Sequence, residues 1–140
     1  DNIVAVGTTS VRTLESLAAL AWRIRCEGSP ASERVVGQWE LYDIPQEFSG
    51  REVLQTIAEY MRKNGVEQLK AATQIMITPL GYRFRVVRYI ITNFHQPKST
   101  LLLLVGAYVG DDWHRIYDYA VAHDFRFLSY GDSSLLKVAR

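Results

Sequence analysis

The sequence predicts an α/β protein in which helices flank a layered, mixed sheet in a Rossmann-like arrangement. First, the apolar and β-branched run Ile3–Val6 ends at Gly7 and leads into a helical pattern. Second, strand-like and helix-like segments alternate along the rest of the chain. Third, 140 residues with 48% hydrophobic residues are enough for one domain with a real core. We therefore expect residues 1–140 to form a single α/β domain.

The individual elements follow from periodicity and from turn residues. Apolar residues recur at helical spacing from Val11 to Ile24, with Thr9 or Ser10 as the N-cap. Gly50–Lys63 has one apolar and one charged face, typical of an amphipathic helix, and Asn64-Gly65 closes it. The other expected elements are a surface loop at 27–34, strands at 35–42, 73–78, 84–92 and 125–128, a helix at 100–108, and a helix at 113–123 capped by Asp112.

Composition narrows the class of protein. A formal net charge of +1 gives no global basic field, so nucleic-acid binding would need a local patch or a further part of the protein. The single cysteine, Cys26, excludes an internal disulfide and argues against a zinc site. The longest apolar run, Leu101–Tyr108, is too short to span a bilayer, and no signal peptide opens the chain. A cytoplasmic protein is expected, and the start within a strand suggests the downstream part of a longer one.

Hydroxyl groups and an arginine follow the first strand. Thr8, Thr9 and Ser10 stand at the start of the expected helix, where free N–H groups and the helix dipole favour an anion. Arg12 is a cation at this positive helix end, which an anionic partner would explain. A salt bridge from Arg12 to Glu15 or to another nearby carboxylate explains it equally well.

The strand–helix junction at 93–100 holds a close group of polar side chains that could form a site. Asn93, His95, Lys98, Ser99 and Thr100 lie between an extended segment and an apolar helix. Ser99 or Thr100 can cap the helix, and its start would bind an anion or a developing negative charge. The alternative is a structural histidine and a solvated lysine beside an ordinary capped helix.

Two further polar groups have both a functional and a structural interpretation. A strand ending at Leu128 would deliver Tyr130 and Asp132 to the sheet edge, where ligands bind in α/β folds. A turn in which Asp132 is only a cap is the alternative. Arg83, Arg85 and Arg88 alternate with apolar residues and would form either a local basic patch or a solvated sheet edge.

Three segments together resemble the S-adenosylmethionine:tRNA ribosyltransferase-isomerases of queuosine biosynthesis. The segments are Val6–Glu15, Ile91–Leu102 and Arg126–Asp132. The resemblance implies that S-adenosylmethionine donates its ribosyl unit, which is transferred and isomerised onto 7-aminomethyl-7-deazaguanine at the tRNA wobble position, giving epoxyqueuosine. S-adenosylmethionine is then a co-substrate, and neither a cofactor nor a metal is expected. The implied partners are tRNA and S-adenosylmethionine, with no membrane.

The resemblance also implies boundaries and roles. The chain would be the C-terminal part of the catalytic domain of a larger two-domain enzyme, without the upstream portion and an inserted β-barrel, and the surface left uncovered would favour self-association. His95 and Lys98 are the candidate catalytic residues, with His95 as acid or base and Lys98 beside an anion. The candidate substrate-binding residues are Thr8, Thr9, Ser10, Arg12, Asn93, Ser99, Thr100, Tyr130 and Asp132. A noncatalytic binding or assembly domain and a generic nucleotide-binding module are the alternatives.

Overall fold

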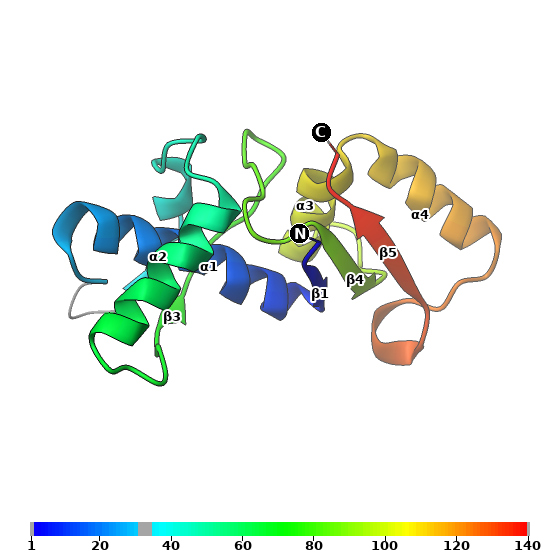
Figure 1. Cartoon of the computed structure of the whole chain (residues 1–140). Helices are drawn as coiled ribbons and strands as arrows, with labels where there is room; N and C mark the ends of the chain where they lie inside the picture. Colours follow the sequence, from blue (N-terminus) through cyan, green and yellow to red (C-terminus); the bar gives the residue numbers. More distant parts are fainter. Residues whose placement is uncertain (1, 31–34, 140) are drawn as a thin grey trace.

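The computed structural model describes residues 2–30 and 35–139, so residues 31–34 of the expected 27–34 loop lie outside it. The mixed α/β class is confirmed, with α1 and α2 together at one end, a three-stranded sheet in the middle and α4 at the other end (Figure 1). The strands are β1 Val4–Val6, β2 Val35–Val36, β3 Ala72–Thr73, β4 Tyr89–Asn93 and β5 Ser133–Lys137. The helices are α1 Thr8–Glu27, α2 Gly50–Lys63, α3 Thr100–Val109 and α4 Asp112–Ala122, with 3₁₀ turns η1 Glu40–Tyr42 and η2 Leu128–Tyr130.

The main sheet has the order β1-β4-β5, with β4 in the centre. β1 runs parallel to β4, so that Val6 is paired with Ile91, and β5 runs antiparallel, so that Ile90 is paired with Leu136. Three strands do not test the Rossmann-like strand order, which stays a prediction. Parallel pairing of β1 and β4 places the two motif-bearing strand ends at the same edge of the sheet.

The strand predicted over 84–92 is correct only in its second half. The N–H groups of Arg85, Val86 and Val87 donate to the carboxylate of Glu15 on α1, at 3.0, 2.9 and 2.8 Å. The hydroxyl of Tyr82 donates to the same carboxylate at 2.6 Å. A strand neighbour is therefore replaced by one fully buried carboxylate, which ties α1 to the segment that enters β4.

Neither the basic patch nor the solvated sheet edge considered for Arg83, Arg85 and Arg88 is formed, because these residues are not in a strand. Arg85 turns inward, and its Nη2 donates to the carbonyl oxygen of Ile44 at 2.8 Å. Arg83 stays exposed and Arg88 is half-buried. The three arginines therefore point to different surroundings.

The strand predicted at 125–128 is wrong, and the last strand is β5 instead. The rings of Phe125 and Phe127 pack against Phe94, with centroid distances of 5.6 and 5.5 Å. Leu128 has a φ of 61°, which no strand tolerates, and its N–H donates to the Phe94 carbonyl at 2.8 Å. Aromatic residues typical of a strand thus form a cluster around the junction.

The strands predicted at 35–42 and 73–78 are present only as the short strands β2 and β3, which pair in parallel. Two further hydrogen bonds extend the pairing, from Gln74 N to Val36 O and from Met76 N to Gln38 O, both at 2.9 Å. After Gly37 the chain turns into η1, because the Glu40 carboxylate accepts the Gly37 N–H at 2.8 Å.

Local signals predicted α2 within its observed bounds. Ser49 and Glu52 form a capping box at its start, and Gly65 has a φ of 62° just beyond its end. The cap expected for α4 is wrong. This helix begins at Asp112 itself rather than after it, and the preceding residue, Asp111, makes no side-chain hydrogen bond that caps the helix.

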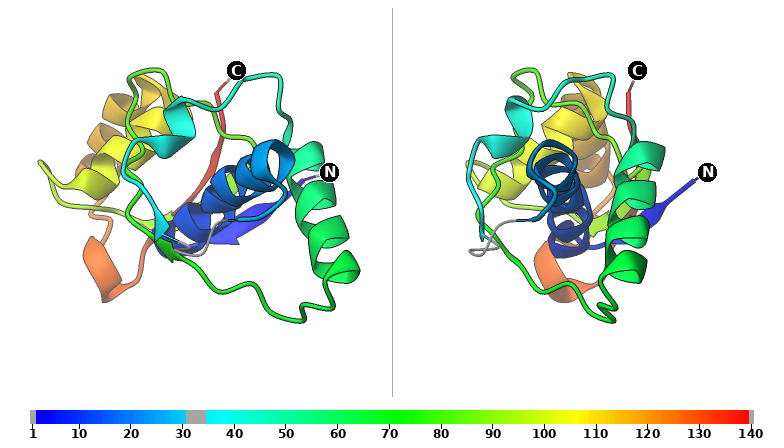
Figure 2. Two further views of the ribbon diagram at one scale, coloured as in Figure 1. Left: turned by 90° about the vertical axis from the view of Figure 1, so that its left-hand side faces the viewer. Right: turned by 60° about the vertical axis from the view of Figure 1, so that its left-hand side comes forward.

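The two faces of the main sheet differ in burial. Ala5, Ile90 and Leu136 are neighbours across the three strands and point into the core, where α3 contributes Val105 and Tyr108. The views in Figure 2 show α1 and α2 packed side by side at one end of the molecule. On the opposite sheet face, Val6 and Leu135 are 67% and 65% exposed.

Candidate active site

Two motifs meet at one edge of the main sheet. α1 begins directly after β1, and the 93–100 junction begins directly after β4. The Gly7 N–H donates to the Ile91 carbonyl at 2.8 Å, which continues the strand pairing into the turn. The structure therefore brings together the starts of two segments that are about eighty residues apart in the sequence.

The start of α1 differs from the prediction. Its N-cap is Gly7, with a φ of 87°, and not Thr9 or Ser10. A positive φ is accessible to glycine, so the chain turns there and the helix begins at Thr8. Thr9 and Ser10 lie exposed on the first turn, and Arg12 is the fifth helical residue, two or three positions further in than the predicted caps imply. The helix dipole therefore bears less directly on Arg12 than the sequence suggested.

His95 is buried at the junction, with 9% of its surface exposed. Its Nε2 lies 2.9 Å from the Thr92 hydroxyl, and its backbone N–H donates to the Tyr117 hydroxyl at 2.9 Å. Burial without a charged partner lowers the pKa of His95 below its usual value. The imidazole is thus neutral at neutral pH. Its ring contacts Thr92 of β4, and the His95 backbone is held by Tyr117 of α4.

Lys98 and Ser99 are the two residues directly before α3. Ser99, one of the two caps considered from the sequence, is the N-cap of this helix, and its hydroxyl accepts the Leu102 N–H at 3.3 Å. Lys98 is exposed and has a φ of 63°, a left-handed conformation that is uncommon for a residue with a side chain. Thr100 is the first helical residue, so its N–H and that of Leu101 point out of the helix start without partners in the helix.

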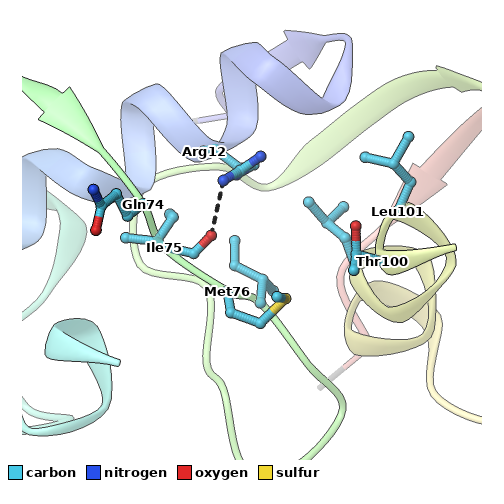
Figure 3. A pocket seen from close by; sticks show the side chains of 8 residues that line it. Arg12, Gln74, Ile75, Met76, Thr100 and Leu101 are labelled. Atoms are coloured by element: carbon cyan, nitrogen blue, oxygen red, sulfur yellow. Dashed lines mark hydrogen bonds between the residues drawn. The ribbon is translucent and has the colours of Figure 1, made fainter. Parts of the chain in front are cut away.

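Arg12 and Thr100 line one cavity, between α1, the 74–77 segment and the start of α3 (Figure 3). The Nη2 group of Arg12 donates to the Ile75 carbonyl at 3.0 Å. The predicted alternative of a salt bridge to Glu15 does not occur, because that carboxylate is occupied by Tyr82 and the 85–87 backbone. The other predicted site residues do not line this cavity.

Asp132 and Tyr130 lie at the far end of the sheet from α2, before β5. The Asp132 carboxylate accepts the Arg126 N–H at 2.5 Å, and this hydrogen bond is the main reason why its pKa is lowered. Tyr130 is 75% exposed on η2. The Asp132 carboxylate therefore closes the turn between residues 126 and 132, in agreement with the structural interpretation of this residue. Asn93 reaches the same region, where its Oδ1 accepts the Ser133 hydroxyl at 2.8 Å.

Two residues at the site were missed by sequence reasoning. The Glu15 carboxylate accepts backbone N–H groups of the segment that leads into β4, and the Tyr117 hydroxyl accepts the His95 backbone N–H. An acidic residue at a core-facing helix position is the signal that identifies Glu15, because Val11 and Ala18 share its face. Tyr117 carries no such signal, since its contact depends on how α4 folds back on the junction.

Among the described residues, no group of three or more His, Cys, Asp or Glu side chains is placed to hold a metal ion. In the same ranges, no helix has the length and hydrophobicity needed to cross a membrane.

The fold and the junction define an α/β protein with a polar site at the carboxyl ends of two parallel strands. A family model described as queuosine biosynthesis protein matches residues 1–136, so the chain belongs to this family. It is 50% identical over 88 residues to an S-adenosylmethionine:tRNA ribosyltransferase-isomerase of Cereibacter sphaeroides, covering 62% of this chain and 25% of the relative. It is 55% identical over 73 residues to the protein of that name from Brucella ovis, covering 51% and 20%.

A solved structure supports the same assignment. The S-adenosylmethionine tRNA ribosyltransferase of Thermotoga maritima matches with a TM-score of 0.59 and 31% identity, over 96% of this chain and 32% of that one. The chain therefore spans about a fifth to a quarter of the length of the curated relatives that it matches and about a third of this structure.

Proposed function

We propose that this chain forms part of the active site of an S-adenosylmethionine:tRNA ribosyltransferase-isomerase, the activity for which its curated relatives are named. The proposed reaction moves the ribosyl unit of S-adenosylmethionine onto 7-aminomethyl-7-deazaguanine at the tRNA wobble position and isomerises it to give epoxyqueuosine, with release of adenine and methionine. S-adenosylmethionine is the co-substrate, tRNA is the acceptor, and neither a metal nor a cofactor is assigned. The proposed location is the cytoplasm.

One observation carries the proposal, namely the buried and neutral imidazole of His95 at the carboxyl end of the central strand. The chemistry begins with loss of a proton from carbon beside the sulfonium, which requires a general base. A neutral histidine is suited to this step, because its lone pair is free to accept a proton at neutral pH. A surface histidine would spend part of its time protonated and would be less well oriented.

The Thr92 contact gives the imidazole a defined orientation. When His95 carries its hydrogen on Nε2 and donates it to the Thr92 hydroxyl 2.9 Å away, the basic lone pair is on Nδ1. Thr92 is then a positioning residue for the proposed base. The Tyr117 bond to the His95 backbone adds a second restraint.

The surrounding polar residues are assigned to substrate groups. Lys98, Ser99 and Thr100 at the α3 start and Arg12 on α1 supply positive potential for anionic parts of the substrates. Asn93, Tyr130 and Asp132 lie near the start of β5 and are assigned to the nucleobase or ribose. Thr8, Thr9 and Ser10 are assigned to binding an anionic group of a substrate at the start of α1, where no side chain caps the helix.

The proposal is tested in a full-length protein, because the chain spans a quarter of its Cereibacter sphaeroides relative. In a chimera, this chain replaces the matching part of that relative, and adenine release from S-adenosylmethionine is followed with tRNA carrying the 7-deazaguanine. We expect adenine release that depends on tRNA, as in the unaltered relative assayed in parallel. A folded chimera that releases no adenine under these conditions would contradict the function.

A noncatalytic assembly role has one observation in its favour, the exposed apolar sheet face at Val6 and Leu135. If that role is correct, the chimera binds S-adenosylmethionine and keeps full turnover when His95 is replaced. A generic nucleotide-binding module would instead bind ordinary mononucleotides as well as S-adenosylmethionine.

A further inference from the structure

The cavity beside Arg12 is small, half-enclosed and unusual in its charge. Its volume is about 70 Å³. The polar side chains that line it are those of Arg12, Gln74 and Thr100. Its apolar lining comes from Ile75, Met76, Ile77, Leu101 and Leu104. Figure 3 shows Arg12 on one side and Thr100 on the other, contributed by α1 and α3. No carboxylate is among the lining residues, so the only formal charge on the wall is positive.

The guanidinium group of Arg12 lacks some of its possible hydrogen-bond partners among the described residues. One of its terminal nitrogens donates to the Ile75 carbonyl, but its Nε atom is buried and has no hydrogen-bond partner among the described residues. Arg12 makes no ion pair with any residue in the described ranges. Buried polar groups and charges are normally paired, because an unpaired one keeps its desolvation penalty. Because Nε has almost no accessible surface, an anion in the cavity would be held by the terminal guanidinium nitrogens, which lie at the end of a charge that no described acidic side chain neutralises.

The opposite wall supplies further donors rather than a counter-ion. The first-turn N–H groups of Thr100 and Leu101 have no partner within α3, and the helix dipole makes this end positive. The first turn of α3 contains no acidic residue. The guanidinium of Arg12 and the α3 start therefore bear on the same small volume with the same sign.

We propose that this cavity binds one oxyanion, a carboxylate or a phosphate group, between Arg12 and the first turn of α3. The volume holds a few water-sized groups and excludes a nucleoside, so only the charged end of a larger molecule enters. The two sources rest on the proposed function: the methionine carboxylate of S-adenosylmethionine and a backbone phosphate of tRNA. Each of the two anion sites expected from the sequence contributes one residue to this cavity, Arg12 from the first and Thr100 from the second.

The test measures thermal unfolding of the 140-residue chain with three added probes at constant ionic strength. The probes are inorganic phosphate, L-methionine, and methioninamide, which lacks the carboxylate. We expect phosphate or L-methionine to raise Tm in a saturable way, by roughly 9 °C at about one hundred times Kd, because a ligand that binds only the folded state stabilises it. Methioninamide should have no effect. A response to L-methionine alone assigns the donor carboxylate, and a response to phosphate alone assigns tRNA.

Variants assign the effect to the cavity. Arg12→Gln should abolish the rise in Tm, and Arg12→Lys should reduce it, because lysine keeps the charge but loses the planar donor pair. Arg62→Gln removes an exposed arginine from α2 and should leave the rise unchanged. If Arg12→Gln does not fold, the Arg12 Nε–H signal in ¹⁵N NMR of the unaltered chain should shift with the same probes.

The proposal is overturned if neither oxyanion raises Tm, or if the rise persists in folded Arg12→Gln. No turnover is measured, so the result is independent of the adenine assay. Oxyanion binding without adenine release in the chimera would reject the function alone. Adenine release without oxyanion binding would reject this cavity alone.

Discussion

The Thr92–His95 contact is the residue-scale feature on which the proposed chemistry depends most directly. Thr92→Val removes the hydroxyl 2.9 Å from Nε2 and keeps the side-chain shape. In the chimera we expect kcat to fall about tenfold with little change in KM, because substrate binding does not use Thr92. Thr92→Ser should restore most of the rate, since it returns the hydroxyl. Equal kcat values for the valine variant and the unaltered protein would show that Thr92 does not position the base.

The lowered pKa of His95 also predicts a pH effect on stability. The unfolded histidine titrates near 6.5, whereas the folded one titrates at a lower pH, so the unfolded state binds more protons in the interval between the two. Stability from this residue is complete above about pH 6.5 and is lost as the pH falls towards the folded pKa.

Urea unfolding of the 140-residue chain between pH 7.5 and 5.5 measures this effect. His95→Asn should flatten the decline in unfolding free energy, whereas His114→Asn, on an exposed histidine of α4, should not. An unchanged slope in His95→Asn would show that the buried imidazole is not the group that titrates.

At the scale of elements, Glu15 links α1 to the segment that enters β4. Its carboxylate accepts four hydrogen bonds at 2.6–3.0 Å. Glu15→Gln replaces one accepting oxygen by a donor that faces N–H groups, so we expect a loss of about 2–4 kcal/mol in unfolding free energy. Tyr82→Phe removes one of the four donors and should cost about 1 kcal/mol.

Chemical denaturation measures both losses, with Glu59→Gln on the exposed face of α2 as the matched control. A change below about 0.5 kcal/mol for Glu15→Gln, as is usual for surface sites, would refute the proposed role of this carboxylate.

These elements also show what a sequence can and cannot predict. α2 and the Ser99 cap were predictable, because their signals lie within a few residues of each other. The 84–88 segment looks like a strand by composition, but the N–H groups of residues 85–87 are taken by Glu15, some seventy residues earlier. The shared cavity of Arg12 and Thr100 depends on the parallel pairing of β1 with β4, which no local pattern specifies.

At the scale of the whole molecule, one face of the main sheet is apolar and uncovered. Val6, Ile91 and Leu135 lie in one row across the three strands, and the outer two residues are 67% and 65% exposed. Contiguous exposed apolar surface of this kind favours association. We therefore expect the 140-residue chain to self-associate as its concentration rises, as the sequence also suggested.

Sedimentation velocity over a range of concentrations tests this expectation. Val6→Thr combined with Leu135→Thr should shift the chain towards the monomer, because threonine keeps β propensity and removes apolar surface. Leu80→Thr is the control, since Leu80 is 84% exposed but lies in the turn at 79–81 and not in a strand. A chain that stays monomeric at every concentration would contradict the expectation.

The central claim is that His95 is the base that starts ribosyl transfer, and its most direct test is adenine release by the His95→Ala chimera. We predict that turnover falls by about two to four powers of ten relative to the unaltered chimera, while S-adenosylmethionine binding is retained. His114→Ala should leave turnover unchanged. A loss smaller than tenfold, with binding intact, would remove His95 from the chemistry and leave the junction with a structural role.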